Sequence, residues 1–177
     1  MKRISLLAAA VGLVAAGALY GADAPKTPRA EINFDHPDKF TDIKDEMYPT
    51  DQGQQAILDR IRDFLVVEAR EYIPEGCKLT MTFTDIRLAG EFEPWRGPRW
   101  DQTRIVTPLY PPRFVFNWTV TDAAGRTIKQ GQEDIRDVAF YLRVTLDPQD
   151  PLRYEKSILG DWMRGSLGNV RQMVASN

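Results

Sequence analysis

Arginine and aromatic residues alternate with prolines in one long segment, which runs from about Pro94 to Arg113. An arginine guanidinium offers planar, bidentate donors to a carboxylate or a phosphate, and a tryptophan or tyrosine ring offers a rigid face to a sugar, a base or a peptide. A loop of this length is usually functional or disordered, and its aromatic content argues against disorder. We therefore predict that a ligand binds Trp95, Arg96, Arg99, Trp100, Arg104, Tyr110 and Arg113.

The same loop also has a structural interpretation, which we rank slightly ahead of ligand binding. Trp95 or Trp100 would then fill the end of a sheet, and the arginines would stack on tryptophan or pair with Glu91, Glu93 and Asp101. Loops often contain functional residues, but packed residues hold such loops in position. Under either interpretation this loop is the surface to test.

Three carboxylates give a second, catalytic hypothesis. Glu91 and Glu93 face the same side of an extended chain, so with Asp85 they could converge for general acid–base chemistry. A hydrolase or a transferase would use such a group. A surface charge pair explains the same spacing, and we favour that explanation.

Other chemistries lack the residues that they require. The single cysteine, Cys77, is expected to be a buried small residue at the start of a strand, and the single histidine, His36, a turn residue before Pro37. One histidine and one cysteine make no ordinary zinc site, so we predict no metal. The chain has no glycine-rich phosphate loop and no dinucleotide motif, so we predict no cofactor. A net charge of −2 gives no case for nucleic acid.

The N-terminus has the form of a secretory signal peptide. Two basic residues precede an apolar run from Ile4 to Leu19 that ends in small residues. We predict a signal peptide over 1–18, with cleavage possible as late as Ala22, and an extended leader over 19–29. The apolar run falls short of the roughly 20 residues that span a bilayer. The mature protein is therefore expected in the periplasm, without an integral membrane segment.

Hydrophobic periodicity predicts a single globular domain over 30–170. Alternating residues indicate strands over 30–35, 78–84, 114–120 and 127–135, the last at an edge, with a bulge or bend near Asp85. Apolar residues at helical spacing indicate amphipathic helices over 51–72 and from Pro151 onward. Thr50 or Asp51 can cap the first helix, Asp150 is expected to cap the second, and Gly165 and Gly168 form a weak point in the second. Residues 138–146 fit either a strand or a short helix.

These elements predict an α+β fold. Its sheet is mostly antiparallel, has about four strands and packs two amphipathic helices on one face.

Several short motifs resemble those of a family of exported bacterial proteins, known as domain of unknown function 3016. They are Phe40-Thr41-Asp42-Ile43, the run from Thr84 to Trp95, Tyr110-Pro111-Pro112-Arg113, Leu152-Arg153-Tyr154-Glu155-Lys156, Leu159 and Asp161-Trp162. The run Ala-Gly-Glu-Phe-Glu-Pro-Trp is the most specific of them, and the resemblance covers about residues 30–164. It implies export into a Gram-negative envelope, and it provides no catalytic residues to transfer.

The sequence thus predicts a non-enzymatic periplasmic module that uses the loop over 94–113 to bind an envelope protein or a small anionic or glycan ligand. The alternatives are the hydrolase or transferase described above and a scaffold subunit whose aromatic surface is an oligomer interface.

Overall fold

A computed structural model describes residues 28–100, 102–145 and 147–176. The predicted signal peptide and residues 19–27 of the leader lie outside this described part. The elements in chain order are β1 (Ala30–Phe34), η1 (Pro37–Lys39), α1 (Asp51–Tyr72), β2 (Lys78–Arg87), β3 (Glu91–Phe92), η2 (Pro94–Arg96), β4 (Arg104–Ile105), β5 (Arg113–Thr121), β6 (Thr127–Arg136), η3 (Phe140–Leu142), α2 (Arg153–Leu167) and α3 (Val170–Ala175).

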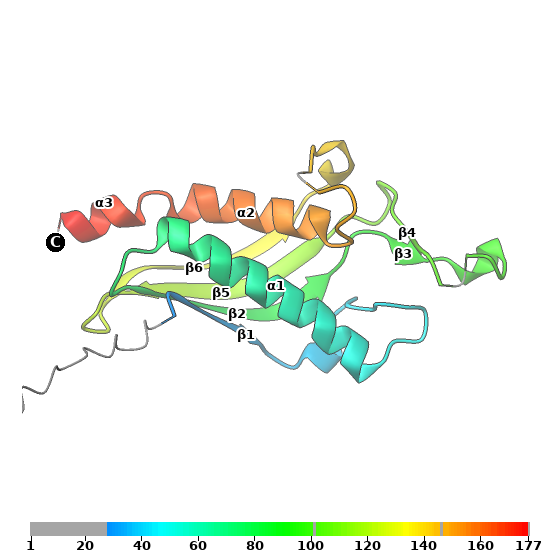
Figure 1. The fold of residues 1–177 in the computed structure, drawn as a ribbon, viewed down its shortest axis with the longest axis horizontal. Coiled ribbons are helices and arrows are strands. Elements are labelled where there is room, and N and C mark those ends of the chain that lie inside the picture. The colour runs from blue at the N-terminus through cyan, green and yellow to red at the C-terminus, as the bar shows by residue number, and fades with distance from the viewer. Residues whose placement is uncertain (1–27, 101, 146, 177) are drawn as a thin grey trace, which may run out of the picture.

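The main sheet has four strands in the order β1-β2-β5-β6 (Figure 1). β5 pairs antiparallel with β2 and with β6, while β1 runs parallel to β2. A short turn joins β5 to β6, whereas the long segment 88–112 joins β2 to β5. A parallel pair needs a crossover connection, and α1 provides it between β1 and β2. The predicted α+β fold with a mostly antiparallel sheet is confirmed, and β6 lies at the predicted edge.

The bulge predicted near Asp85 is also confirmed. Phe83 lies opposite Phe116 and Asp85 lies opposite Val115, so Thr84 is the extra residue in β2. An extra residue shifts the alternation of side chains by one position. The bulge therefore keeps both Phe83 and Ile86 in the core while it directs Asp85 to the polar face.

Both long helices cover the same face of the sheet (Figure 1). α1 spans its predicted range, and the hydroxyl of Thr50 caps it by accepting a hydrogen bond from the Gly53 N–H at 3.0 Å. From α2, the Trp162 ring packs edge-on against Phe116 and Trp118, with centroids 4.8 and 5.5 Å apart. Within the part of the chain that the structure describes, the opposite face of the sheet carries polar residues and no helix covers it (Figure 1).

Two local predictions need correction. α2 begins at Arg153 with Leu152 at its N-cap, so Asp150 is not the cap. The Asp150 carboxylate instead accepts from the Leu152 N–H and pairs with Arg60 and Lys156, which draws it into a preceding turn. The second correction is partial: α2 runs through Gly165, but it ends at Leu167, at the weak point predicted for Gly168.

The segment that fitted either a strand or a helix contains a short 3-10 helix, η3. Among the described residues, no helix is long and apolar enough to cross a membrane.

Candidate functional site

The predicted binding loop folds as a hairpin that extends beyond one end of the main sheet (Figure 1). Its two short strands, β3 and β4, pair Glu91 with Ile105 and Phe92 with Arg104. η2 begins the tip, and the chain returns through Thr107–Tyr110 to β5. The loop therefore has a packed base, formed by β3 and β4, and a protruding tip that begins at η2. The predicted site residues are divided between these two parts.

Arg104 belongs to the base. Its two terminal nitrogens donate to the buried Asp42 carboxylate at 2.7 and 3.0 Å, and they also donate to the carbonyls of Gly90 and Lys44. The guanidinium lies over the Phe92 ring, 4.8 Å from its centroid. These contacts occupy Arg104, so it anchors the hairpin to the segment before α1.

A buried carboxylate fixes the base from the other side. Glu155 on α2 accepts a hydrogen bond from the Ala89 N–H at 2.7 Å, immediately before the hairpin. Burial raises the pKa of Glu155 above its ordinary value, and the Ala89 hydrogen bond opposes that rise. α2 therefore holds the hairpin in place through a group that sequence reasoning did not identify.

Glu93 and Arg96 form an ion pair within the first turn of the tip. The Glu93 carboxylate is buried, whereas Arg96 remains exposed. The pKa of the nearby Tyr110 phenol is raised, first by desolvation and then by a hydrogen bond with Glu93. Arg96 and Tyr110 are thus coupled to the same carboxylate at the start of the tip.

The outer part of the tip exposes its aromatic side chains. Trp95 is 71% exposed and Trp100 is 45% exposed, and Arg99 between them is also exposed. Neither tryptophan fills the end of the sheet, which is the role that the structural interpretation gave to them. Asp101, the third acid suggested as an arginine partner, lies outside the described residues.

The three candidate catalytic carboxylates contact three different arginines. Asp85 pairs with Arg113 and accepts hydrogen bonds from Thr41, Glu91 lies 3.8 Å from Arg87, and Glu93 pairs with Arg96. The structure therefore gives these acids separate ionic partners and does not join them as an acid–base pair.

Arg113 brings together residues that the loop motif did not include. On β5 it lies directly between Arg87 on β2 and Arg136 on β6. These three arginines line a recess on the open face of the sheet, together with Thr41, Pro111 and Asp134. Sequence reasoning missed Arg87 and Arg136 because only the register of the strands places them beside Arg113.

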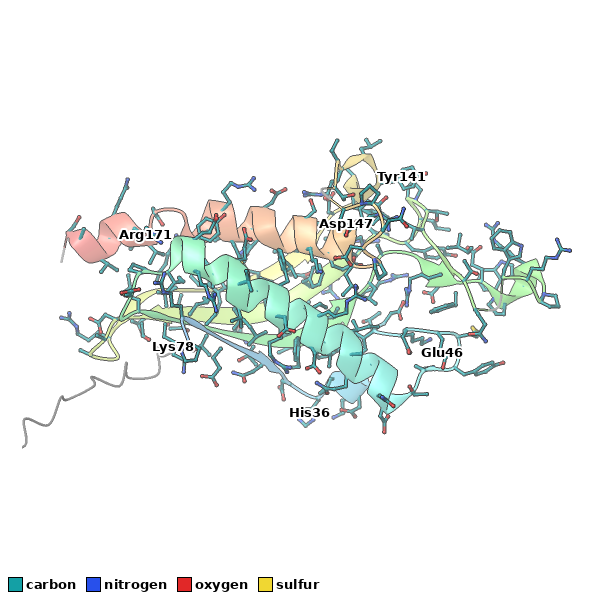
Figure 2. All side chains as sticks on the ribbon, viewed as in Figure 1. His36, Glu46, Lys78, Tyr141, Asp147 and Arg171 are labelled. Carbon is teal, nitrogen blue, oxygen red and sulfur yellow. The ribbon has the colours of Figure 1, made fainter. Side chains whose placement is uncertain are left out.

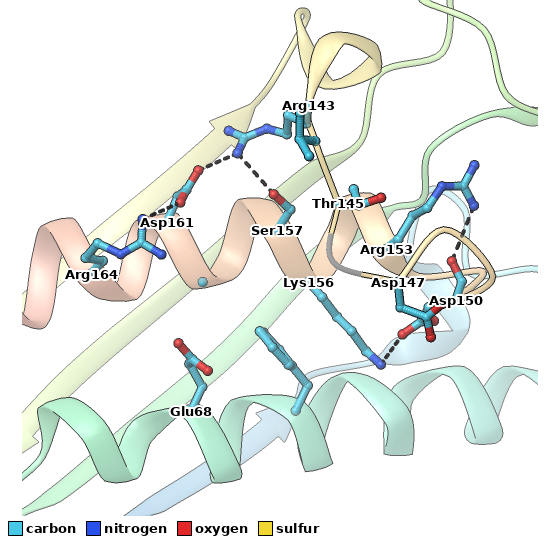
Figure 3. Close-up of a pocket in the computed structure, with 13 residues that line it drawn as sticks. Glu68, Arg143, Thr145, Asp147, Asp150, Arg153, Lys156, Ser157, Asp161 and Arg164 are labelled. Carbon is cyan, nitrogen blue, oxygen red and sulfur yellow. Dashed lines mark hydrogen bonds and ion pairs between the residues drawn. The ribbon is translucent and has the colours of Figure 1, made fainter.

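A second cavity, of about 500 Å³, lies between α1, α2 and the segment that leads into α2 (Figure 3). Its charged lining residues are balanced: Glu68, Asp147, Asp150 and Asp161 face Arg143, Arg153, Lys156 and Arg164. Several of these pair with one another, such as Lys156 with Asp150 at 2.5 Å and Arg164 with Asp161 at 3.1 Å. Mutual pairing leaves little net charge for a ligand.

The lone histidine and cysteine lie where the sequence suggested. His36 is exposed at the start of η1 with φ 52° (Figure 2), and Cys77 is buried, which raises the pKa of its thiol. Among the residues that the structure describes, no three His, Cys, Asp or Glu side chains gather in a way that could hold a metal ion.

One comparison with known proteins gives a match. A family model described as "Protein of unknown function (DUF3016)" matches residues 28–165, which include the sheet, α1, the hairpin and most of α2. We found no match to the chain among curated proteins or among solved structures.

Proposed function

The chain belongs to the family described as "Protein of unknown function (DUF3016)", and this description names no activity, so we propose a function from the site itself. We propose that the protein is an exported, periplasmic binding module that holds its partner with the tip of the β3–β4 hairpin. The N-terminal sequence supports export, since it has the basic and apolar regions of a signal peptide. The binding role rests on the exposed tip.

The observation that carries the proposal is the exposure of Trp95 and Trp100 on a projecting hairpin. Tryptophan and arginine are enriched among the residues that dominate binding energy at protein interfaces. Leaving two indole rings in water costs hydrophobic free energy, which a partner would recover by covering them. Arg99 lies between the two tryptophans in sequence, is exposed, and adds planar donors for a carboxylate or another anion.

The rigid base makes the tip a better binding surface. The Asp42–Arg104 pair and the Glu155–Ala89 hydrogen bond fix both sides of the hairpin base. A preorganised surface loses less conformational freedom when a partner binds, so more of the contact energy appears as affinity. We propose an envelope protein as the partner, and a small anionic or glycan ligand would use the same donors and rings.

The catalytic alternative draws no support from this geometry, because Asp85, Glu91 and Glu93 each contact a separate arginine.

The experiment compares the mature protein with a tip variant, Trp95→Ala/Arg99→Gln/Trp100→Ala, each isolated gently from the periplasm of its own source. Native mass spectrometry of the parent protein should show an additional bound mass, and the tip variant should lack it while keeping its melting temperature. A matched control, Val67→Ala/Arg164→Gln/Leu142→Ala, changes exposed residues elsewhere and should retain the bound mass. Retention of that mass by the tip variant, or a bare parent protein, would contradict the proposal.

A further inference from the structure

Three arginines occupy one row across three neighbouring strands. In the sheet register Arg87 of β2 lies opposite Arg113 of β5, which lies opposite Arg136 of β6. Like charges directly opposite one another destabilise a sheet. We propose that this row, named here the arginine row, binds a phosphate group on the open face of the sheet.

The middle arginine is already neutralised by the neighbouring acids. Arg113 donates to Asp134 through Nε and Nη2 at 2.7 and 2.8 Å, and through Nη1 to Asp85 at 3.2 Å. The hydrogen bond with Arg113 lowers the pKa of Asp134, so Asp134 stays ionised and holds Arg113 in place. Arg113 therefore serves as a fixed centre, and the outer two arginines remain to bind an anion.

The outer two arginines are less fully paired. The nearest carboxylate to Arg87 is Glu91 at 3.8 Å, which is beyond hydrogen-bond distance, and the buried Nε of Arg87 donates to no acceptor. Within the described part of the chain, Arg136 has no carboxylate within ion-pair distance. A buried donor without an acceptor is costly, so an anion that accepted from Arg87 would be stabilising.

The space beside the row fits such a ligand. The recess has a volume of about 510 Å³, and all three arginines line it together with Thr41, Pro111 and Asp134, whose carboxylate is paired with Arg113. The outer strands are two strand spacings apart, or about 10 Å, which long arginine side chains can bridge through one shared anion. A planar carboxylate suits one guanidinium, whereas the tetrahedral oxygens of a phosphate can accept from several at once. Arg136, which has no ion-pair partner among the described residues, and Arg87, whose contact with Glu91 is long at 3.8 Å, supply positive charge for a phosphate.

This site is separate from the proposed partner surface, because none of the three arginines lies in the outer hairpin tip. A variant that loses phosphate binding at the arginine row therefore need not lose partner binding at the hairpin tip. A soluble phosphomonoester and the headgroup of a phosphomonoester lipid share this chemistry, and both fit the proposal.

Isothermal titration of the mature protein with inorganic phosphate at low ionic strength tests the site. We expect saturable binding that Arg136→Gln weakens about tenfold or more, since a hydrogen bond to a charged group contributes on that scale. Arg136 is exposed, so its variant should fold, and Arg87→Gln provides a second variant with the same expected direction. Arg126→Gln, which removes an exposed arginine from the β5–β6 turn, is the matched control and should bind as the parent does.

Absence of saturable phosphate binding would overturn the proposal. So would equal weakening by Arg126→Gln and Arg136→Gln, because that result would show general attraction to charge. Two further measurements then identify the source of the phosphate group. They are titration with methyl phosphate and sedimentation with phosphatidylcholine vesicles that contain phosphatidic acid. Arg136-dependent vesicle binding indicates a lipid headgroup, and methyl phosphate binding without vesicle binding indicates a soluble phosphomonoester.

Discussion

Arg104 and Asp42 are 62 residues apart in sequence, yet both terminal nitrogens of the guanidinium donate to the Asp42 carboxylate. The carboxylate is 4% exposed and the arginine side chain 17%, so the pair is largely removed from water. It joins the segment before α1 to the base of the hairpin. An arginine that the sequence suggested as a ligand contact therefore holds the binding surface in position.

Arg104→Ala should destabilise the protein by about 3–5 kcal/mol, because it leaves the Asp42 carboxylate buried without its partner. Urea denaturation followed by circular dichroism measures the change. Arg99→Ala is the control on the same hairpin, and because Arg99 is exposed its effect should stay within about 0.5 kcal/mol. Similar free energies of unfolding for the two variants would show that the pair does not stabilise the fold.

The free energy of unfolding of the Glu155→Gln variant should rise relative to that of the parent as the pH increases. Burial raises the pKa of Glu155 in the folded protein above its ordinary 4.5. At a pH below the pKa of the unfolded state, Glu155 is protonated in both the folded and the unfolded protein and does not change the free energy of unfolding. As the pH rises toward the pKa of the folded state, Glu155 ionises in the unfolded protein alone, so the parent loses stability. Glutamine does not titrate, and its amide oxygen can accept the same Ala89 hydrogen bond.

Chemical denaturation of both proteins between about pH 4 and pH 8 measures this effect, because this range begins below the ordinary glutamate pKa and extends above it. Parallel stability curves across that range would contradict the raised pKa of Glu155.

Gly131→Ala should destabilise the protein by about 1–3 kcal/mol through overpacking. Gly131 lies opposite Trp118 in the register, and an added Cβ would lie 2.8 Å from the Trp118 Nε1. The indole there packs on Trp162 and donates to Glu133, so it has little freedom to move.

Gly165→Ala in α2 provides the contrasting substitution. Nothing lies within 4 Å of its added Cβ, so alanine should stabilise the helix by about 0.5–1 kcal/mol. Thermal denaturation of both variants would show opposite shifts in melting temperature, and shifts of the same sign would contradict this packing.

The four tryptophans should divide into two fluorescent classes. Trp95 and Trp100 are exposed at the tip, whereas Trp118 and Trp162 are 5% and 9% exposed in the core. Iodide should quench the parent protein strongly, and a Trp95→Phe/Trp100→Phe variant should show blue-shifted emission that iodide barely affects. Equal quenching of the two proteins would indicate that the tip tryptophans are covered, for example by a second copy of the chain.

Much of the fold was predictable because its signals are local. The helix over 51–72 follows from apolar residues at three- and four-residue spacing and from the Thr50 cap. The bulge follows from one change in the alternation around Asp85. The start of α2 was predicted wrongly because Asp150 has the residue type of an N-cap, but distant Arg60 and nearby Lys156 draw its carboxylate into ion pairs.

The sequence by itself determined the two long helices, the four main strands, the α+β class and the extent of the long loop, since periodicity, capping and turn formation depend on neighbours along the chain. It did not predict the short strands β3 and β4 or the helix α3. Only the tertiary structure decided which charges meet. Arg104 pairs with Asp42 and Arg113 lies between Arg87 and Arg136 because the register and the packing bring remote segments together. Ion pairs act over a few ångströms in space, and no local pattern of residues encodes those distances.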